Sequence, residues 1–325
     1  MCLGVGVMQP YEQLEEQFGN WCGNPNTVSC ASGSAALHLA LETLDISPHT
    51  SVIVPEFTMI SCARAVTLSN LSPLFVDCQD DLLLDVTKIP THNNISAIMP
   101  VHIYGRQCDM EAVHTYAEKR NALVVEDMAE IHGVQPHPKT HAACWSFYKN
   151  KIIAGEEGGM VTFRNPEHVI RAKQLRSCGF TDKHNFLHLP GGMNYRMSNA
   201  HASLILNSLR NVDDNLKKRR QVAEWYTEFL PKKWRMPFRK SCWVYDLRIP
   251  GCTEPKQNQI IEELNARGIP ARHSFKPMSR QPEYRGSYEH LNAHGLSNEV
   301  LYLPLCPEYN RDTIRRFVSV LLSIV

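Results

Sequence analysis

One stretch of the sequence decides the fold: Ala142-Ala143-Cys144-Trp145-Ser146-Phe147-Tyr148-Lys149-Asn150-Lys151, followed shortly by Gly158-Gly159. Its first six residues form a short apolar run, which predicts a strand. A desolvated lysine that has lost its proton forms a Schiff base with an aldehyde cofactor, and glycines let backbone approach a ligand. Lys151 is therefore a candidate to carry pyridoxal phosphate (PLP). The alternative is a solvated surface lysine, as we expect for Lys149.

The sequence around this stretch alternates short β-branched runs with helical patterns. We predict strands at 51–55, 74–77, 96–101, 123–127, 143–147 and 160–163, and helices at 35–44, 109–120 and 166–177. Such alternation indicates an α/β fold, whose mostly parallel sheet is covered on both faces and binds ligands beyond the carboxyl ends of its strands.

After Ser198 the pattern changes. One long helix is predicted from Ser198 to Leu230, followed by a strand at 243–249 and helices at 257–267 and 311–322. We therefore expect a large domain over residues 1–205, with a mixed, mostly parallel sheet. A smaller C-terminal α+β domain is expected over residues 206–325.

The composition is that of an ordinary globular protein. The chain has 325 residues, 43% of them hydrophobic and 21% charged, and a formal net charge of +1. Without a long run of like charge, nothing points to nucleic acid or to a membrane surface. The 11 cysteines are scattered and include no CxxC pair, which favours reduced thiols and a cytoplasmic location.

Two further segments match the needs of the cofactor. Small residues at Gly33, Ser34 and Ala35 open a helix, whose free N–H groups would bind a phosphate, and Ser146 would add a hydroxyl. Asp127 ends a β-branched strand and would keep the pyridine nitrogen protonated. The alternatives are a plain capping serine and a capping or loop carboxylate.

Several segments, in order along the chain, resemble one family of proteins. They are Ser29–Leu37, Pro55–Met59, Val101–Gly105, Glu126–Gly133, Ser146–Lys151 and Gly192–Met197. Together they resemble the DegT/DnrJ/EryC1/StrS family of fold-type-I PLP enzymes, which are mostly nucleotide-sugar aminotransferases. Within that family, Glu130 and the Lys149–Ile153 pattern are most similar to the GDP-perosamine synthase branch.

The resemblance implies a role for each matching position. Lys151 would bind PLP and move the substrate proton, and Asp127 would pair with the pyridinium. Glu130 would lie near the 3′-oxygen of the cofactor, where glutamine is usual, and Met59 would pack on its ring. Asn194 would reach the phosphate of a neighbouring subunit, so that a homodimer shares its active sites.

Three differences from the family pattern concern the substrate side. The chain begins later than members usually do, Glu156 stands where glycine is usual, and the region around His273 differs. We therefore expect the substrate to be less predictable than the cofactor. No metal is expected, because His132, His137, His141 and Cys144 match no standard zinc spacing and are interpreted as loop and strand residues.

The function expected from these residues and the resemblance is transamination. Glutamate or glutamine would give its amino group to PLP, and a keto group of a nucleotide-linked sugar would receive it. Two alternatives stay open at this point. One is other PLP chemistry, such as decarboxylation or elimination on a non-sugar amine or amino acid. The other is a catalytically silent homologue with a binding role.

Overall fold

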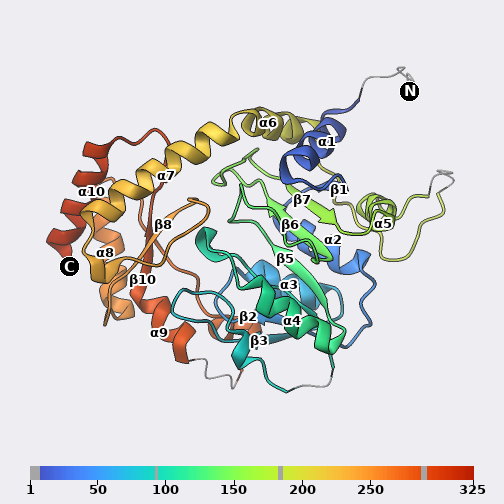
Figure 1. Ribbon diagram of the computed structural model, residues 1–325, viewed down its shortest axis with the longest axis horizontal. Coiled ribbons are helices and arrows are strands. Elements are labelled where there is room, and N and C mark those ends of the chain that lie inside the picture. The colour runs from blue at the N-terminus through green and yellow to red at the C-terminus, as the bar shows by residue number, and fades with distance from the viewer. Residues whose placement is uncertain (1–7, 92–93, 182–185, 287–290) are drawn as a thin grey trace.

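The computed structural model describes residues 8–91, 94–181, 186–286 and 291–325. Two sheets organise these residues (Figure 1). The strands of the larger sheet are β1 (Thr27–Cys30), β2 (Ser51–Pro55), β3 (Ser72–Val76), β4 (Ile95–Ile98), β5 (Leu123–Asp127), β6 (Ala142–Ser146) and β7 (Gly159–Phe163). The smaller sheet contains β8 (Tyr245–Arg248), β9 (Arg272–His273) and β10 (Val300–Leu303).

Helices surround both sheets. The first five are α1 (Pro10–Cys22), α2 (Gly33–Thr43), α3 (Ile60–Leu68), α4 (Met110–Arg120) and α5 (Glu167–Arg176). They are followed by α6 (Asn199–Arg210), α7 (Val212–Phe229), α8 (Glu254–Ala266), α9 (Leu291–Glu299) and α10 (Arg311–Ile324). Among the described residues, no helix is both long and apolar enough to cross a membrane.

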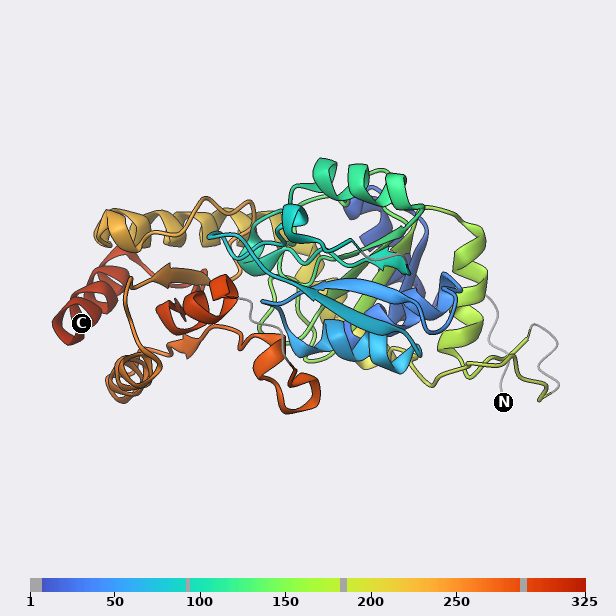
Figure 2. The same ribbon diagram turned by 90° about the horizontal axis from the view of Figure 1, so that it is seen from below.

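The larger sheet is mixed and mostly parallel, as predicted. Its strand order is β1-β7-β6-β5-β4-β2-β3. Strands β6, β5, β4, β2 and β3 are mutually parallel, whereas β7 runs antiparallel to both of its neighbours. Strand β1 therefore points the same way as β6, and the carboxyl ends of β1, β5 and β6 share one edge. Helices α3 and α4 lie on opposite sides of the sheet (Figure 2).

The central strands are apolar because helices cover both faces. Strand β5 has the sequence Leu-Val-Val-Glu-Asp, and its last four residues are buried. The bounds of β2 and β5 match the prediction. The single long helix predicted from 198 to 230 is wrong: α6 ends at Arg210 and α7 begins at Val212, and the side chain of Asn211 between them bonds to the Asn207 carbonyl. Such bonding competes with the helical backbone.

The smaller sheet is antiparallel, in the order β8-β10-β9. Side chains from α7, α8 and α10 pack with it in a second apolar cluster. A buried ion group connects this cluster to the larger sheet: Asp246 binds Arg106 at 2.6 Å and Arg239 at 2.8 Å. The group fixes β8 beside the carboxyl edge of the larger sheet. The domain boundary near residue 205 stays a prediction.

Candidate active site

A cavity of about 380 Å³ lies at the carboxyl edge of the larger sheet. Residues from both sheets and their connections line it: Ser32, Gly33, Ser34, Leu37, Met59, Ser61, Val101, Asp127, Ala129, Glu130, Cys144, Trp145, Ser146, Tyr148, Asn150, Lys151, Glu157, Trp243, Phe275 and Tyr302. In a sheet of this type, the carboxyl ends of neighbouring strands form the usual ligand site. Most of the predicted site residues meet here.

Lys151 is the central cation of the cavity. Its side chain is 10% exposed, and its Nζ lies 3.6 Å from the centre of the Trp243 ring and 3.7 Å from Glu130 Oε1. Burial lowers the pKa of Lys151, although the Glu130 and Asp127 carboxylates oppose this effect. Lys149, two residues earlier, is exposed as predicted. The structure therefore distinguishes one desolvated lysine from its solvated neighbour.

The loop that carries Lys151 is held on both sides of that residue. The Trp243 indole N–H donates to the Asn150 carbonyl at 2.7 Å. The Ile153 N–H donates to His132 Nδ1 at 3.0 Å. The loop thus has partners from the turn after β5 and from the segment before β8, which restricts the positions that the lysine can adopt.

Asp127 ends β5, and both of its carboxylate oxygens accept hydrogen bonds. The Ala129 N–H donates to Oδ1 at 2.9 Å, and the Cys62 thiol donates to Oδ2 at 3.1 Å. The Thr58 hydroxyl lies 3.4 Å from the same sulfur. Burial raises the pKa of Cys62 well above its usual range, so the sulfur stays a thiol and a donor. These partners fix the orientation of the Asp127 carboxylate.

Glu130 follows in the same turn and is also buried. Its Oε2 accepts the Tyr104 backbone N–H at 2.8 Å. Burial raises the pKa of Glu130 to about 7, against the opposing effects of Lys151 and of the Tyr104 N–H. The cavity therefore contains a carboxyl group that changes its charge near neutral pH.

The amino end of α2 forms the other side of the cavity. Ser32 caps the helix, and its Oγ accepts the Ala35 N–H at 3.1 Å. The Ser34 hydroxyl donates to Ser61 Oγ at 2.9 Å. A Cβ atom on Gly33 would lie 2.7 Å from Ser146 Cβ, so only glycine allows β6 to come this close. The free helix amides and three hydroxyls form a site suited to a phosphate.

Three predicted residues lie outside this cluster or at its solvent-exposed margin. The Ala35 N–H is already bonded to the cap, and Ala35 does not line the cavity. Met59 does line it, with a side chain that is half-exposed. Asn194 is exposed and lies outside the cavity of its own chain, so its predicted contact with a second subunit stays untested.

Sequence reasoning missed the aromatic wall of the cavity. Trp243, Phe275 and Tyr302 come from the C-terminal part of the chain and line the cavity, and the Trp243 ring lies against Lys151 Nζ. The Tyr104 ring stacks on Phe275 at 5.4 Å and joins the wall to the larger sheet. No local motif marks these rings, because their role depends on the packing of β8 and β10 against the sheet edge.

The remaining predicted features are structural in this fold. Glu156 adopts a φ of 62°, a left-handed conformation that favours glycine, which explains why glycine is usual there. His137 stacks on His114 at 4.3 Å, away from Lys151. Within the ranges that the structure describes, no group of three or more His, Cys, Asp or Glu side chains is arranged to hold a metal ion.

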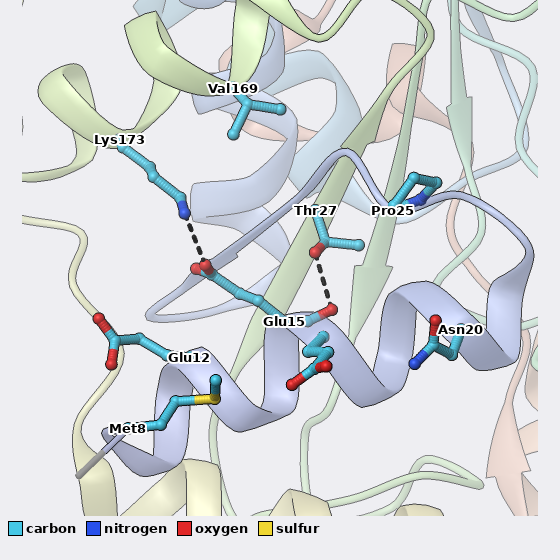
Figure 3. A pocket seen from close by; sticks show the side chains of 9 residues that line it. Met8, Glu12, Glu15, Asn20, Pro25, Thr27, Val169 and Lys173 are labelled. Atoms are coloured by element: carbon cyan, nitrogen blue, oxygen red, sulfur yellow. Dashed lines mark hydrogen bonds and ion pairs between the residues drawn. The ribbon is translucent and has the colours of Figure 1, made fainter. Parts of the chain in front are cut away.

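A second hollow, of about 690 Å³, opens between α1 and α5 (Figure 3). It also contains a buried carboxylate beside a lysine, since Lys173 Nζ lies 3.1 Å from Glu15 Oε2. Glu15 accepts further bonds from Arg176 at 2.7 Å and from the N–H and hydroxyl of Ser29, both at 2.9 Å. These partners satisfy the carboxylate, and the hollow is interpreted as part of the packing of α1.

Comparisons with known proteins agree with this geometry. Residues 8–322 match the model of the DegT/DnrJ/EryC1/StrS aminotransferase family. The chain is 34% identical over 288 residues to a GDP-perosamine synthase of Caulobacter vibrioides, which covers 84% of this chain and 78% of that protein. It is 29% identical to the GDP-perosamine synthase of Escherichia coli O157:H7, over 93% of this chain and 86% of that protein.

Solved structures share the fold. DesV of S. venezuelae, crystallised with a ketimine intermediate, has a TM-score of 0.88 and 26% identity, over 98% of this chain and 89% of that one. Helicobacter pylori PseC, an aminotransferase of pseudoaminic acid biosynthesis, has a TM-score of 0.91 and 19% identity, over 99% and 93% of the two chains. The expected α/β aminotransferase fold and the expected resemblance are both confirmed. This chain belongs to the DegT/DnrJ/EryC1/StrS aminotransferase family.

Proposed function

We propose that this protein transfers an amino group from glutamate or glutamine to the keto group of a nucleotide-linked sugar, with PLP as its cofactor. One observation carries the proposal: Lys151 is buried in the cavity between Trp243 and Glu130, with Asp127 among the lining residues. A lysine with a lowered pKa and a fixed carboxylate are the two groups that an aldehyde cofactor with a pyridine ring requires.

The residues of the cavity fit PLP. When bound, PLP supplies an electron sink that stabilises a carbanion at the amino-bearing carbon. The α2 amides with Ser34, Ser61 and Ser146 would hold its phosphate. Asp127, held by Ala129 and Cys62, would hold the proton on the ring nitrogen.

Lys151 would remove and return protons at the reacting carbon. Burial suits it for this task, because a pKa lowered towards neutral pH makes the amine available as a base. The held loop keeps Nζ within the cavity. Trp243 and the neighbouring rings would exclude water from the reacting atoms.

Two features support a sugar as the acceptor. The wall formed by Trp243, Phe275 and Tyr302 provides aromatic surface in the cavity, against which the C–H groups of a sugar can pack. Relatives include GDP-perosamine synthases and a UDP-N-acetyl-3-dehydro-alpha-D-glucosamine 3-aminotransferase of Acidithiobacillus ferrooxidans, which is 30% identical over 341 residues.

The active form is proposed to be a cytoplasmic homodimer. Asn194 is exposed on the segment between α5 and α6 and does not reach the cavity of its own chain. In a dimer that places this segment against the partner, Asn194 would complete the phosphate site of the other subunit. Sedimentation of the PLP-loaded protein should then give a dimer, and Asn194→Ala should weaken PLP binding.

The test of the proposed function is the donor half-reaction. The PLP-loaded protein receives glutamate or glutamine alone, and its absorbance is followed. We expect the pyridoxamine form of the cofactor to appear and a nucleotide-linked keto-sugar to restore the original spectrum. Release of CO₂ or ammonia from a substrate while the PLP spectrum persists would support decarboxylation or elimination instead.

A further inference from the structure

The cavity contains two carboxyl groups from one turn, and their surroundings differ. Asp127 accepts one hydrogen bond on each oxygen, from Ala129 and Cys62. Within the part of the chain that the structure describes, Glu130 accepts one hydrogen bond, on Oε2, from the Tyr104 N–H. Its Oε1 has Lys151 Nζ at 3.7 Å, beyond ordinary hydrogen-bonding distance. Glu130 is therefore the less completely hydrogen-bonded of the two carboxyl groups.

The geometry identifies which oxygen of Glu130 can carry a proton. Oε2 accepts from a backbone N–H, so a proton on the carboxyl group belongs on Oε1. Oε1 is also the atom nearest to Lys151. Glu130 is 6% exposed, and burial favours its neutral form.

Charged and titratable groups from several elements act on Glu130. Lys151 favours its ionised form, whereas Asp127 of β5 and Asp246 of β8 favour the neutral form. The side chains of Tyr104, Tyr302 and Cys62 also interact with Glu130, and in each of them burial raises the pKa and Glu130 adds to the effect. These three groups are therefore neutral near pH 7, and Lys151 opposes the protonation of Glu130.

The chemistry of PLP makes the protonation state of Glu130 decisive for how this side chain contacts the cofactor. Its aldehyde is flanked on the ring by a hydroxyl oxygen and by the phosphate-bearing arm. Ser146 and the amino end of α2 lie together at the end of β6, whereas Glu130 is bonded to Tyr104, which follows β4 on the other side of β5. With the phosphate arm at α2 and Ser146, the ring oxygen on the opposite flank of the aldehyde would therefore lie toward Glu130. An ionised carboxylate would repel an acidic ring oxygen, whereas a carboxylic acid can donate to it.

We propose that Glu130 binds the cofactor as a neutral carboxylic acid, which donates a hydrogen bond from Oε1 to the ring oxygen beside the aldehyde. This inference rests on the proposed use of PLP. It assigns opposite protonation to the two neighbours: Asp127 binds as an acceptor and Glu130 binds as a donor. Glutamine in place of Glu130 would keep the donor without the ionisation.

The predicted consequence is a pH-dependent affinity for PLP. Below the Glu130 pKa of about 7, the free protein already has the acid form. Above it, an ionised Glu130 must take up a proton on binding, which weakens binding by up to about tenfold per pH unit. Glu130→Gln lacks this ionisation. The ratio of the wild-type Kd to the variant Kd should therefore rise with pH, and effects common to both proteins cancel in the ratio.

The experiment measures PLP binding to apo-protein by absorbance, from about one pH unit below that pKa to about two units above it. The proteins are wild type, Glu130→Gln and Glu157→Gln; Glu157 is an exposed carboxylate that lines the same cavity. We expect the ratio to rise for Glu130→Gln and to stay flat for Glu157→Gln. A flat or falling ratio for Glu130→Gln overturns the inference.

A second measurement needs no variant. The infrared difference spectrum of wild-type protein, PLP-loaded minus apo, should show the C=O stretch of a newly protonated carboxylic acid at about one pH unit above the Glu130 pKa. A spectrum without this band contradicts the inference even if Glu130→Gln does not fold. If wild type binds no PLP at any pH, the proposed function itself fails and the inference falls with it. If PLP binds without the pH effect, only the inference fails.

Discussion

The cavity at Lys151 and the hollow beside α1 (Figure 3) both place a buried carboxylate next to a lysine, yet they differ in how completely each carboxylate is paired. The Glu15 carboxylate pairs with Arg176 and Lys173 and accepts two hydrogen bonds from Ser29. The Glu130 carboxyl group accepts a hydrogen bond from the Tyr104 N–H, and Lys151 lies beyond hydrogen-bonding distance from it. A fully paired charge stabilises a fold, whereas an incompletely paired one remains available to a ligand.

Alanine variants of Lys151 and Lys173 should show the largest difference, in the rate of amino transfer and in cofactor absorbance. Lys151→Ala should lower the rate of amino transfer by at least about 10²–10⁴-fold, because proton transfer at the reacting carbon is lost, and the protein should lose the absorbance of lysine-bound PLP. Lys173→Ala should keep both the rate and the absorbance. Its side chain is 46% exposed, and such surface pairs contribute about 0–1 kcal/mol to stability. Equal activity losses in the two variants would remove the distinction between the sites.

Glutamine variants of Glu15 and Glu130 should differ in stability, and here the larger effect is expected away from the cavity, at Glu15. Glu15→Gln leaves the buried Arg176 guanidinium without its carboxylate, which costs about 3–5 kcal/mol when such a pair is broken. Glu130→Gln keeps an acceptor for the Tyr104 N–H and should change the free energy of unfolding much less. Denaturant unfolding of both variants measures the difference. Equal destabilisation would mean that Glu130 is a structural charge like Glu15.

The smallest expected effect concerns Cys62. Cys62→Ala removes the donor to Asp127 Oδ2 and should cost about 0.5–1.5 kcal/mol, or up to about tenfold in PLP affinity. Cys62→Ser keeps a donor and should restore most of that affinity. Equilibrium binding of PLP to both variants provides the measurement. If the alanine and serine variants bind alike, the thiol does not position Asp127.

Much of the large sheet and most of the cofactor side were predictable from local sequence. Strands such as β2 and β5 are buried on both faces and therefore read as continuous apolar runs. Asp127 and Ser146 end such strands, and Lys151 lies in the loop after β6, so the sheet topology brings them to one edge. Gly33 was predicted to belong to the phosphate site because small residues open the helix. The structure explains the need for glycine, because a Cβ atom at this position would collide with Ser146.

The rest depends on contacts between segments that are distant in the sequence. Trp243 and Phe275 line the cavity only because β8 and β10 pack beside the edge of the larger sheet. The break at Asn211 was hidden because helical spacing continues on both sides of it. The hydrogen bond from Cys62 to Asp127 spans two elements and follows no motif. Asn194 needs a second subunit before its role can be tested.

The central claim is that Lys151, and no other lysine, holds the cofactor. PLP-loaded protein is reduced with borohydride, digested and mapped by mass spectrometry. The account predicts one stable PLP adduct per chain, on the peptide that contains Lys151, and none in Lys151→Ala. An adduct on another residue, such as the exposed Lys149, or a PLP-coloured protein that gives no adduct at Lys151, would contradict it.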